Sequence, residues 1–148
     1  ELRRPDVVDD GLVLLRWLLD HETLDGHLSP TPVGGSGPGD DRCRFDQQPI
    51  EVAALADACH RAHLVTGDDE WRRGVNLAIG WFAGDNDLNA TMWDPDTHGG
   101  YDGLTPTGPN LNQGAESTLA LISTLQYAPR VQTGERKPML TSRGPSTG

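Results

Sequence analysis

Two segments of the chain place amide and carboxylate side chains directly before a predicted helix. They are residues 45–51, Phe-Asp-Gln-Gln-Pro-Ile-Glu, and residues 108–118, Gly-Pro-Asn-Leu-Asn-Gln-Gly-Ala-Glu-Ser-Thr. In each segment a glutamate, Glu51 or Glu116, falls in the first turn of the helix. Carboxylates and amides carry several donors or acceptors on one side chain, which suits a ligand rich in hydroxyl groups. The two segments therefore favour a carbohydrate ligand.

The carboxylates in and near these segments are candidates for glycoside chemistry, which uses two carboxyl groups separated by roughly 5–10 Å. The catalytic candidates are Glu51, Glu116 and Asp102. Because a helix N-terminus stabilises an ionised carboxylate, Glu51 and Glu116 are better suited to be bases or hydroxyl anchors than proton donors. The candidate substrate-binding residues are the neighbouring polar and aromatic side chains Asp46, Gln47, Gln48, Trp93, Tyr101, Asn110, Asn112 and Gln113.

The same residues also have a structural interpretation. Side chains of residues 46–48 and 110–113 can accept hydrogen bonds from the unpaired N–H groups of a helix start, and Glu51 or Glu116 can close a capping box. Trp93 and Tyr101 can hold their loop onto the helices instead of stacking on a sugar ring. Capping accounts for one or two polar groups per helix, and each segment supplies more, so the surplus favours a ligand.

Other chemistries have weaker support. Residues 85–96 follow part of an EF-hand register, but Ala90 stands where that loop needs glycine and Asp96 where it needs glutamate. His60 and His63 do not have the i, i+4 spacing of a helical metal pair. The chain contains no phosphate-binding or dinucleotide-binding glycine motif. We therefore expect neither a metal nor a cofactor. A domain stabilised by calcium is a weaker alternative to a carbohydrate site.

The charge of the chain limits its partners. The formal net charge of the 148 residues is -10. Residues 129–148 carry a net charge of +3, so -13 remains on residues 1–128. Such an acidic body repels phosphate backbones and anionic lipids, which argues against nucleic acid and membrane surfaces as partners. The chain also lacks an apolar run of bilayer length. We expect a cytoplasmic protein in which Cys43 and Cys59 are reduced.

Apolar residues recur at helical spacing in four places. They predict helices near residues 7–23, 49–66, 69–83 and 113–127. No segment alternates with period two over a useful length, so we predict an all-α fold with one domain over residues 1–128. Residues 129–148 are rich in Pro, Gly, Ser and Thr and are expected to form a disordered tail.

The loop lengths predict how the helices are oriented. Only residues 66–68 join the second and third helices, which makes them antiparallel. The connections over residues 24–48 and 84–112 are long, and loops of this length often carry function. If the helices alternate in direction, the second and fourth begin at the same end. Both long loops, with Glu51 and Glu116, would then share one rim.

Six short motifs in order resemble a known family. They are residues 25–30 (Asp-Gly-His-Leu-Ser-Pro), 45–51, 66–68 (Thr-Gly-Asp), 81–88 (Trp-Phe-Ala-Gly-Asp-Asn-Asp-Leu), 101–104 (Tyr-Asp-Gly-Leu) and 112–118. From Gly11 to Leu125 the chain resembles the α/α-toroid module of the six-hairpin glycosidase-like superfamily that bacteria attach C-terminally to glycosyltransferases. The resemblance implies antiparallel helical hairpins with a carbohydrate-facing site at one rim. A complete toroid has about 12 helices, so the chain would be a partial toroid.

The resemblance also implies a function and partners. The chain would be the C-terminal part of a glycosyltransferase-associated carbohydrate-active module in glycan or polysaccharide metabolism, with glycoside hydrolysis or transfer as its chemistry. It would associate with the rest of a parent glycosyltransferase chain or with itself. The alternative is a non-catalytic carbohydrate-binding or scaffolding module in which the same residues hold hydroxyl groups or cap helices.

Overall fold

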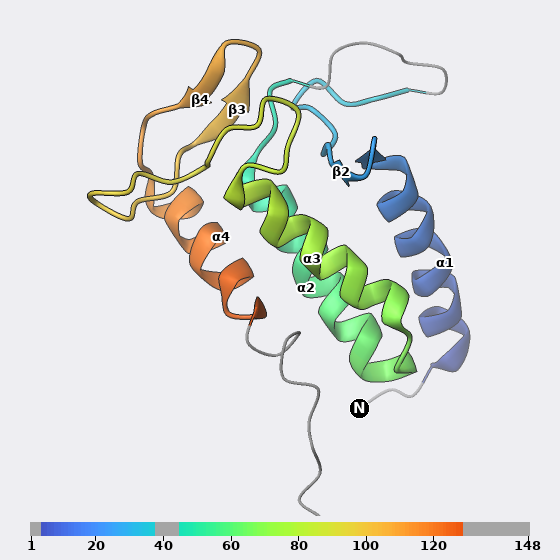
Figure 1. The fold of residues 1–148 in the computed structure, drawn as a ribbon. Coiled ribbons are helices and arrows are strands. Elements are labelled where there is room, and N and C mark those ends of the chain that lie inside the picture. Colours follow the sequence, from blue (N-terminus) through green and yellow to red (C-terminus); the bar gives the residue numbers. More distant parts are fainter. Residues whose placement is uncertain (1–3, 38–44, 129–148) are drawn as a thin grey trace, which may run out of the picture.

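The computed structural model describes residues 4–37 and 45–128. Its helices are α1 (Pro5–His21), α2 (Pro49–Thr66), α3 (Asp69–Ala83) and α4 (Ala115–Leu125), and its strands are β1 (Thr23–Leu24), β2 (His27–Leu28), β3 (Gly103–Thr105) and β4 (Gly108–Asn110). Helices α2 and α3 lie side by side, with α1 and α4 flanking the pair (Figure 1). The predicted disordered tail and Cys43 lie outside the described residues.

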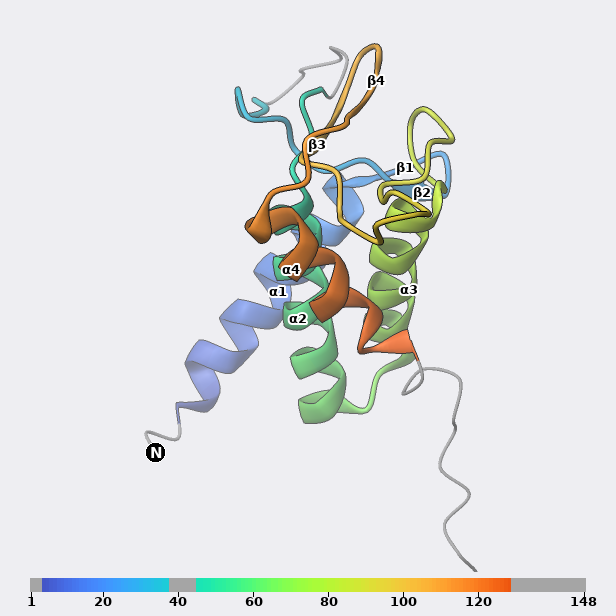
Figure 2. The same cartoon turned by 90° about the vertical axis from the view of Figure 1, so that its left-hand side faces the viewer.

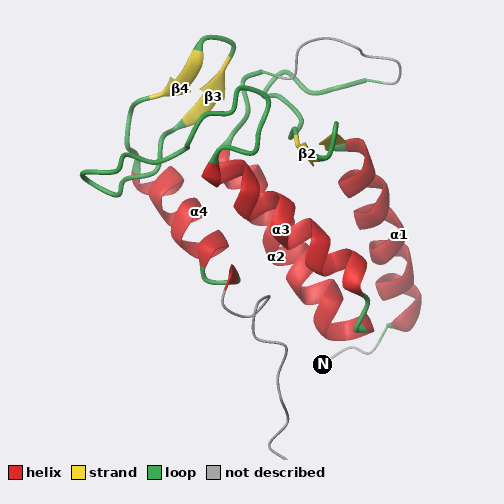
Figure 3. Ribbon diagram, viewed as in Figure 1, coloured by secondary structure: helices red, strands yellow, loops and turns green. Residues whose placement is uncertain are grey.

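The prediction of an all-α fold is wrong, because the long loops contain two small antiparallel sheets (Figure 3). Strand β1 pairs with β2, and β3 pairs with β4. Residues Asp25 and Gly26 join β1 to β2 with φ angles of 49° and 91°. Positive φ at both central residues is the type I′ turn of tight hairpins. Strands of two or three residues are too short to show a period of two, which is why the sequence pattern did not predict them. The fold is mixed rather than a purely helical partial toroid.

Local signals account for the bounds of α2 and α3, which agree with the prediction. Pro49 occupies the first turn of α2, where its missing N–H is not needed. Gly67 ends α2 with a φ of 74°, and its N–H donates to the His63 carbonyl over 2.8 Å. Asp68 then accepts a hydrogen bond from the Glu70 N–H at the start of α3. The short link makes α2 and α3 antiparallel, as expected.

The core lies mainly between α2 and α3, and the two helices approach each other closely at Cys59 and Gly74. A β-carbon added to Gly74 would lie 2.6 Å from the Cys59 sulfur and 3.2 Å from a Leu19 methyl group. Glycine at this position therefore lets the two helices approach closely. Cys59 is a fully buried free cysteine, and its burial raises the pKa of the thiol to about 12.

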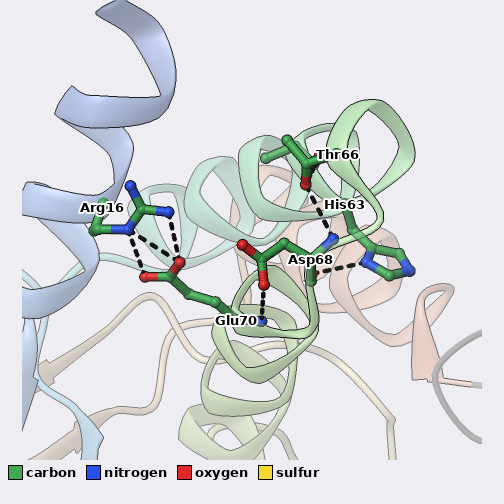
Figure 4. Close-up of polar contacts among 6 residues, drawn as sticks. Arg16, His63, Thr66, Asp68 and Glu70 are labelled. Atoms are coloured by element: carbon green, nitrogen blue, oxygen red, sulfur yellow. Dashed lines mark hydrogen bonds and ion pairs between the residues drawn. The ribbon is translucent and has the colours of Figure 1, made fainter. Parts of the chain in front are cut away.

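An ion pair fastens α1 to the start of α3 (Figure 4). The Arg16 guanidinium donates from Nε and Nη2 to the Glu70 carboxylate, over 2.7–3.0 Å. The same guanidinium lies 5.1 Å from the centre of the Trp71 ring, which is fully buried. Arg16 therefore both neutralises Glu70 and covers Trp71, and the hydrogen bonds from Arg16 lower the pKa of Glu70.

Candidate functional site

The long loops meet at one end of the molecule, where α1 and α3 end and where α2 and α4 begin (Figures 1 and 2). We call this end the rim and define it as residues 22–37, 45–51 and 84–117. The common end of the α2 and α4 starts agrees with the orientation predicted from loop lengths. The rim therefore contains both first-turn glutamates and all of the predicted binding residues.

Gln47 is a buried connection and not an exposed binding residue. Its side chain is fully buried, and Oε1 accepts a hydrogen bond from Trp81 Nε1 over 2.8 Å. Nε2 donates to Asp87 Oδ2. The Gln47 backbone pairs with Leu104 in both directions, at 3.0 and 2.9 Å. The predicted substrate-binding role is thus replaced by a structural one, because the buried indole N–H of Trp81 requires an acceptor.

Asp87 joins Gln47 to the β1–β2 hairpin. Its Oδ1 lies 3.2 Å from His27 Nε2, and both side chains are more than four-fifths buried. This pairing connects the loop after α3 to the turn region after α1. Asp87 falls in the EF-hand-like register, but its carboxylate contacts the side chains of Gln47 and His27. Among residues 4–37 and 45–128, no group of three or more His, Cys, Asp or Glu residues is arranged to hold a metal ion.

Asp102 caps helix α4 from a distant loop. Its Oδ1 accepts hydrogen bonds from the Gly114 N–H over 2.8 Å and from the Ser117 hydroxyl. Its own N–H lies 3.1 Å from the Asn110 carbonyl and 3.0 Å from that of Asn112. A capping carboxylate satisfies otherwise unpaired N–H groups of the helix start. Asp102 was predicted as catalytic, but these contacts give it a structural role.

The loop that precedes β3 is also braced by side chains. The Asp94 carboxylate accepts hydrogen bonds from the N–H groups of Thr97 and Asp96, which lower its pKa, and from Gln113 Nε2 over 3.1 Å. Gln113 Oε1 accepts from the Thr97 hydroxyl over 2.6 Å. Gln113 therefore ties the start of α4 to this loop, although it remains exposed to solvent.

Trp93 and Tyr101 are half-buried and pack against the core. Their backbones help to close the loop, since Trp93 forms a β-bridge with Gly100 and the Tyr101 N–H donates to the Met92 carbonyl over 3.0 Å. This arrangement agrees with the interpretation in which the aromatic residues hold the loop onto the helices. Each still presents part of its side chain to solvent.

The other predicted site residues keep their polar groups at the surface. Gln48 is half-buried and is the N-cap of α2, but its side chain forms no capping hydrogen bond. Asn110 Oδ1 accepts from the Asn112 N–H over 3.2 Å. The exposed members of this group are Asp46, Glu51, Asn110, Asn112 and Glu116. Within residues 4–37 and 45–128, the Glu116 carboxylate has no hydrogen-bond partner.

Glu51 differs from the expectation for a helix N-terminus. Its pKa is raised, first because its carboxyl is partly removed from water and then because of the negative charge of Glu22. Glu51 as a whole is exposed, but its carboxyl group is partly shielded from water. Desolvation and a like charge therefore outweigh the helix N-terminus, and the pKa direction is opposite to the prediction.

Glu22 is a rim carboxylate that the sequence analysis missed. The residue is 5% exposed, and its Oε1 accepts a hydrogen bond from the Thr31 N–H over 2.9 Å. Its backbone carbonyl accepts from the Ser29 N–H over 2.8 Å. Glu22 follows Leu15 and Leu19 on the buried face of α1. A carboxylate that continues an apolar stripe is the signal by which sequence reasoning can find such a residue.

Comparison with known proteins finds no family model that matches the chain and no match to a curated protein.

Proposed function

We propose that the rim binds a carbohydrate and that the chain is part of a glycosyltransferase-associated, carbohydrate-active module of glycan or polysaccharide metabolism. One observation carries the proposal. A separate set of residues, Gln47, Asp94 and Asp102, makes the hydrogen bonds that hold the rim together. The polar side chains of Asp46, Gln48, Glu51, Asn112 and Glu116 lie beside that framework, together with Asn110, which accepts one hydrogen bond from the Asn112 N–H. These side chains carry the donors and acceptors that a hydroxyl-rich ligand uses.

The raised pKa of Glu51 supports a role in proton transfer. Glycoside hydrolysis pairs a carboxylic acid of raised pKa with a second, ionised carboxylate. Glu51 is the proposed acid, and Glu22 is the proposed positioning residue whose charge keeps Glu51 protonated to a higher pH. Glu116 is the proposed second carboxylate, since its side chain is exposed at the neighbouring helix start.

A non-catalytic carbohydrate-binding module is the second candidate. The contacts of Asp102 favour it, because one of the three carboxylates predicted for catalysis caps helix α4 through Oδ1. In this case Glu51, Asn112 and Glu116 would hold hydroxyl groups without transferring a proton. The proposed macromolecular partner in both cases is the rest of a parent glycosyltransferase chain or a second copy. No helix among the described residues has the length and apolarity needed to cross a membrane.

A panel of immobilised oligosaccharides, followed by turnover assays on the sugars that bind, tests the proposal. We expect Asn112→Ala to weaken glycan binding and Glu51→Gln to remove turnover while binding persists. Asp9→Asn is the matched control, because Asp9 is an exposed carboxylate on α1 away from the rim. Binding without any turnover would select the non-catalytic module. The absence of glycan binding across the panel, or equal binding by all variants, would contradict the proposed function.

A further inference from the structure

The rim is the acidic end of the molecule. Its residues, 22–37, 45–51 and 84–117, include ten carboxylates and neither lysine nor arginine, so their formal charge is -10. The other described residues contain eight carboxylates and five arginines, which gives them a formal charge of -3. In the sequence, residues 38–44 contain two Asp and two Arg and therefore add no net charge. Negative charge is thus concentrated at the end that carries the proposed ligand site.

Outside the rim, arginine neutralises half of the carboxylates. Four of those eight carboxylates form ion pairs with arginine, over 2.6–3.3 Å. Four of the five arginines lie toward the helix ends that point away from the rim (Figure 1): Arg4, Arg61, Arg72 and Arg73. The fifth, Arg16, is bound to Glu70 at the start of α3. Within the described chain, arginine therefore leaves the charge of the rim uncompensated.

Inside the rim, the carboxylates have neutral donors or none. Four of the ten accept hydrogen bonds from N–H, hydroxyl or amide groups, and one of these four also contacts His27. The other six are exposed and make no side-chain hydrogen bond within residues 4–37 and 45–128: Asp25, Asp46, Glu51, Asp85, Asp96 and Glu116. Burial and then the negative charge of Glu22 raise the pKa of Glu51, which agrees with a rim that lacks compensating cations.

A ligand that enters the rim meets this charge. Like charges placed against each other oppose binding, so uronates and sugar phosphates are disfavoured. A neutral sugar gains only hydrogen bonds to its hydroxyl groups. An ammonium group gains a charge-assisted hydrogen bond to a carboxylate, which is stronger than a neutral one. Within residues 4–37 and 45–128 no three acidic groups converge as metal ligands do, so the charge is spread over the rim and suits cations spaced along an oligosaccharide.

We propose that the glycan recognised at the rim carries ammonium groups, as glycans of de-N-acetylated hexosamines do. This inference rests on the proposed function. The polar side chains of the two helix starts make the rim a candidate sugar site, and the distribution of charge decides only which class of sugar that site takes.

Two exposed carboxylates are the proposed partners of the ammonium groups. Asp46 lies two residues before the N-terminus of α2 that begins at Pro49, beside the predicted binding residue Gln48. Asp96 lies near the start of α4, because its N–H donates to the Asp94 carboxylate, which also accepts from Gln113. One carboxylate at each helix start then binds a cation, and Glu51 and Glu116 stay available for the proposed proton transfer and charge stabilisation.

Matched sugars separate the charge of the ligand from its sugar character. The probes are tetramers of glucosamine and of galactosamine, their N-acetylated counterparts and a galacturonate tetramer, each titrated calorimetrically into the full chain at about pH 6, where the amines are protonated. We expect the amino forms to bind about tenfold more tightly than the neutral forms at low salt, since several exposed pairs each contribute a small gain. This preference should shrink at high salt, and galacturonate should not bind.

The outcomes distinguish this inference from the proposed function. Binding only of neutral or anionic sugars, among these probes or on the oligosaccharide panel, would overturn the ammonium preference and leave a carbohydrate site standing. Equal binding of amino and N-acetylated forms would do the same. If no sugar binds, both proposals are wrong. Tetralysine that binds as tightly as the glucosamine tetramer would show a site for cations in general and would also overturn the inference.

Single-charge variants locate the effect. Asp46→Asn and Asp96→Asn each remove one charge with little change in size, and each should weaken binding of the glucosamine tetramer about two- to fivefold while the N-acetylated tetramer changes less. Asp9→Asn is the matched control, since it removes the same charge from α1 away from the rim and should leave binding unchanged. Equal weakening by all three variants would assign the preference to the overall charge of the chain and would contradict recognition at the rim.

Discussion

Trp81 and Gln47 are joined by a hydrogen bond of 2.8 Å from the indole Nε1 to the amide Oε1, and both side chains are fully buried. Trp81 belongs to the core helix α3, and Gln47 directly precedes the N-cap of α2. The bond therefore attaches the loop before α2 to the core. Gln48 and Glu51 of the proposed site follow Gln47 in the N-cap and first turn of α2, so a buried amide holds the segment that carries them.

Replacing Gln47 tests this attachment. Gln47→Ala leaves the Trp81 N–H without an acceptor and removes the donor to Asp87, so we expect the free energy of unfolding to fall by about 2–4 kcal/mol. Urea unfolding followed by tryptophan fluorescence measures the change. Gln48→Ala is the control and should lie within about 0.5 kcal/mol of wild type, because the Gln48 side chain makes no cap. Equal losses in the two variants would argue against the connecting role of Gln47.

Asp102 can be tested as a cap or as a catalytic group. Asp102→Ala removes the acceptor for the Gly114 N–H and should lower the free energy of unfolding by about 1–2 kcal/mol. Asp102→Asn keeps an oxygen acceptor and should lose less. Hydrogen exchange at the first amides of α4 should accelerate in Asp102→Ala. If Asp102→Asn abolishes turnover while both stability and exchange stay unchanged, the carboxylate has a chemical role that the capping contacts do not explain.

The raised pKa of Glu51 predicts a pH-dependent gain in stability for Glu51→Gln. The charged form is disfavoured in the folded state, so wild-type stability falls as the pH rises from the usual glutamate pKa, roughly 4.3, through the raised folded-state pKa. The variant should therefore be more stable than wild type at pH 7 and equal to it near pH 3.5. Chemical unfolding at the two pH values gives the comparison, and a variant that is less stable at pH 7 would contradict the predicted direction.

Glu70 should behave in the opposite way. Because Arg16 lowers the pKa of Glu70, the ion pair adds stability above the usual glutamate pKa, and this contribution is lost as the pH falls through the lowered folded-state pKa. We expect Glu70→Gln to be less stable than wild type at pH 7 and to approach it below about pH 3.5. The pair is partly exposed, so high salt should narrow the difference at pH 7. A constant difference from pH 7 to pH 3 would show that the ion pair is not its source.

The close contact between α2 and α3 predicts a cost for Gly74→Ala. The added methyl group would meet the Cys59 sulfur at 2.6 Å, and overpacking of this kind costs about 1–3 kcal/mol. Cys59→Ala in the same chain removes the sulfur and should recover part of the loss. Gly11→Ala is the matched control, since nothing lies within 4 Å of its added methyl group and alanine is the better helix former. Thermal unfolding of wild type, Gly74→Ala, the double variant and Gly11→Ala measures the effect, and a Gly74→Ala variant as stable as wild type would contradict the close contact.

Local sequence determined the helices and their direction. The ends of α2 and α3 depend on residues within or next to their terminal turns: Pro49 and Asp68 at the starts, Gly67 and Gly84 at the ends. The short link at Gly67 makes the two helices antiparallel. The β1–β2 hairpin was equally local, through Asp25 and Gly26, but its strands were too short for a periodicity test. Orientation then followed from the loop lengths, and this brought Glu51 and Glu116 to one rim.

Only the tertiary structure decided which polar side chains of the rim remain at the surface. Gln47 and Trp81 are 34 residues apart, and Asp102 and Gly114 are 12 apart, so no local pattern pairs them. The same holds for Glu22, whose charge acts on Glu51 from the C-cap of α1, 29 residues earlier in the chain. Burial makes an unpaired polar group costly, and the partner that relieves the cost comes from whichever segment the fold brings near. Residues of the same type in one motif therefore separate into buried connectors and exposed candidates only when the chain is folded.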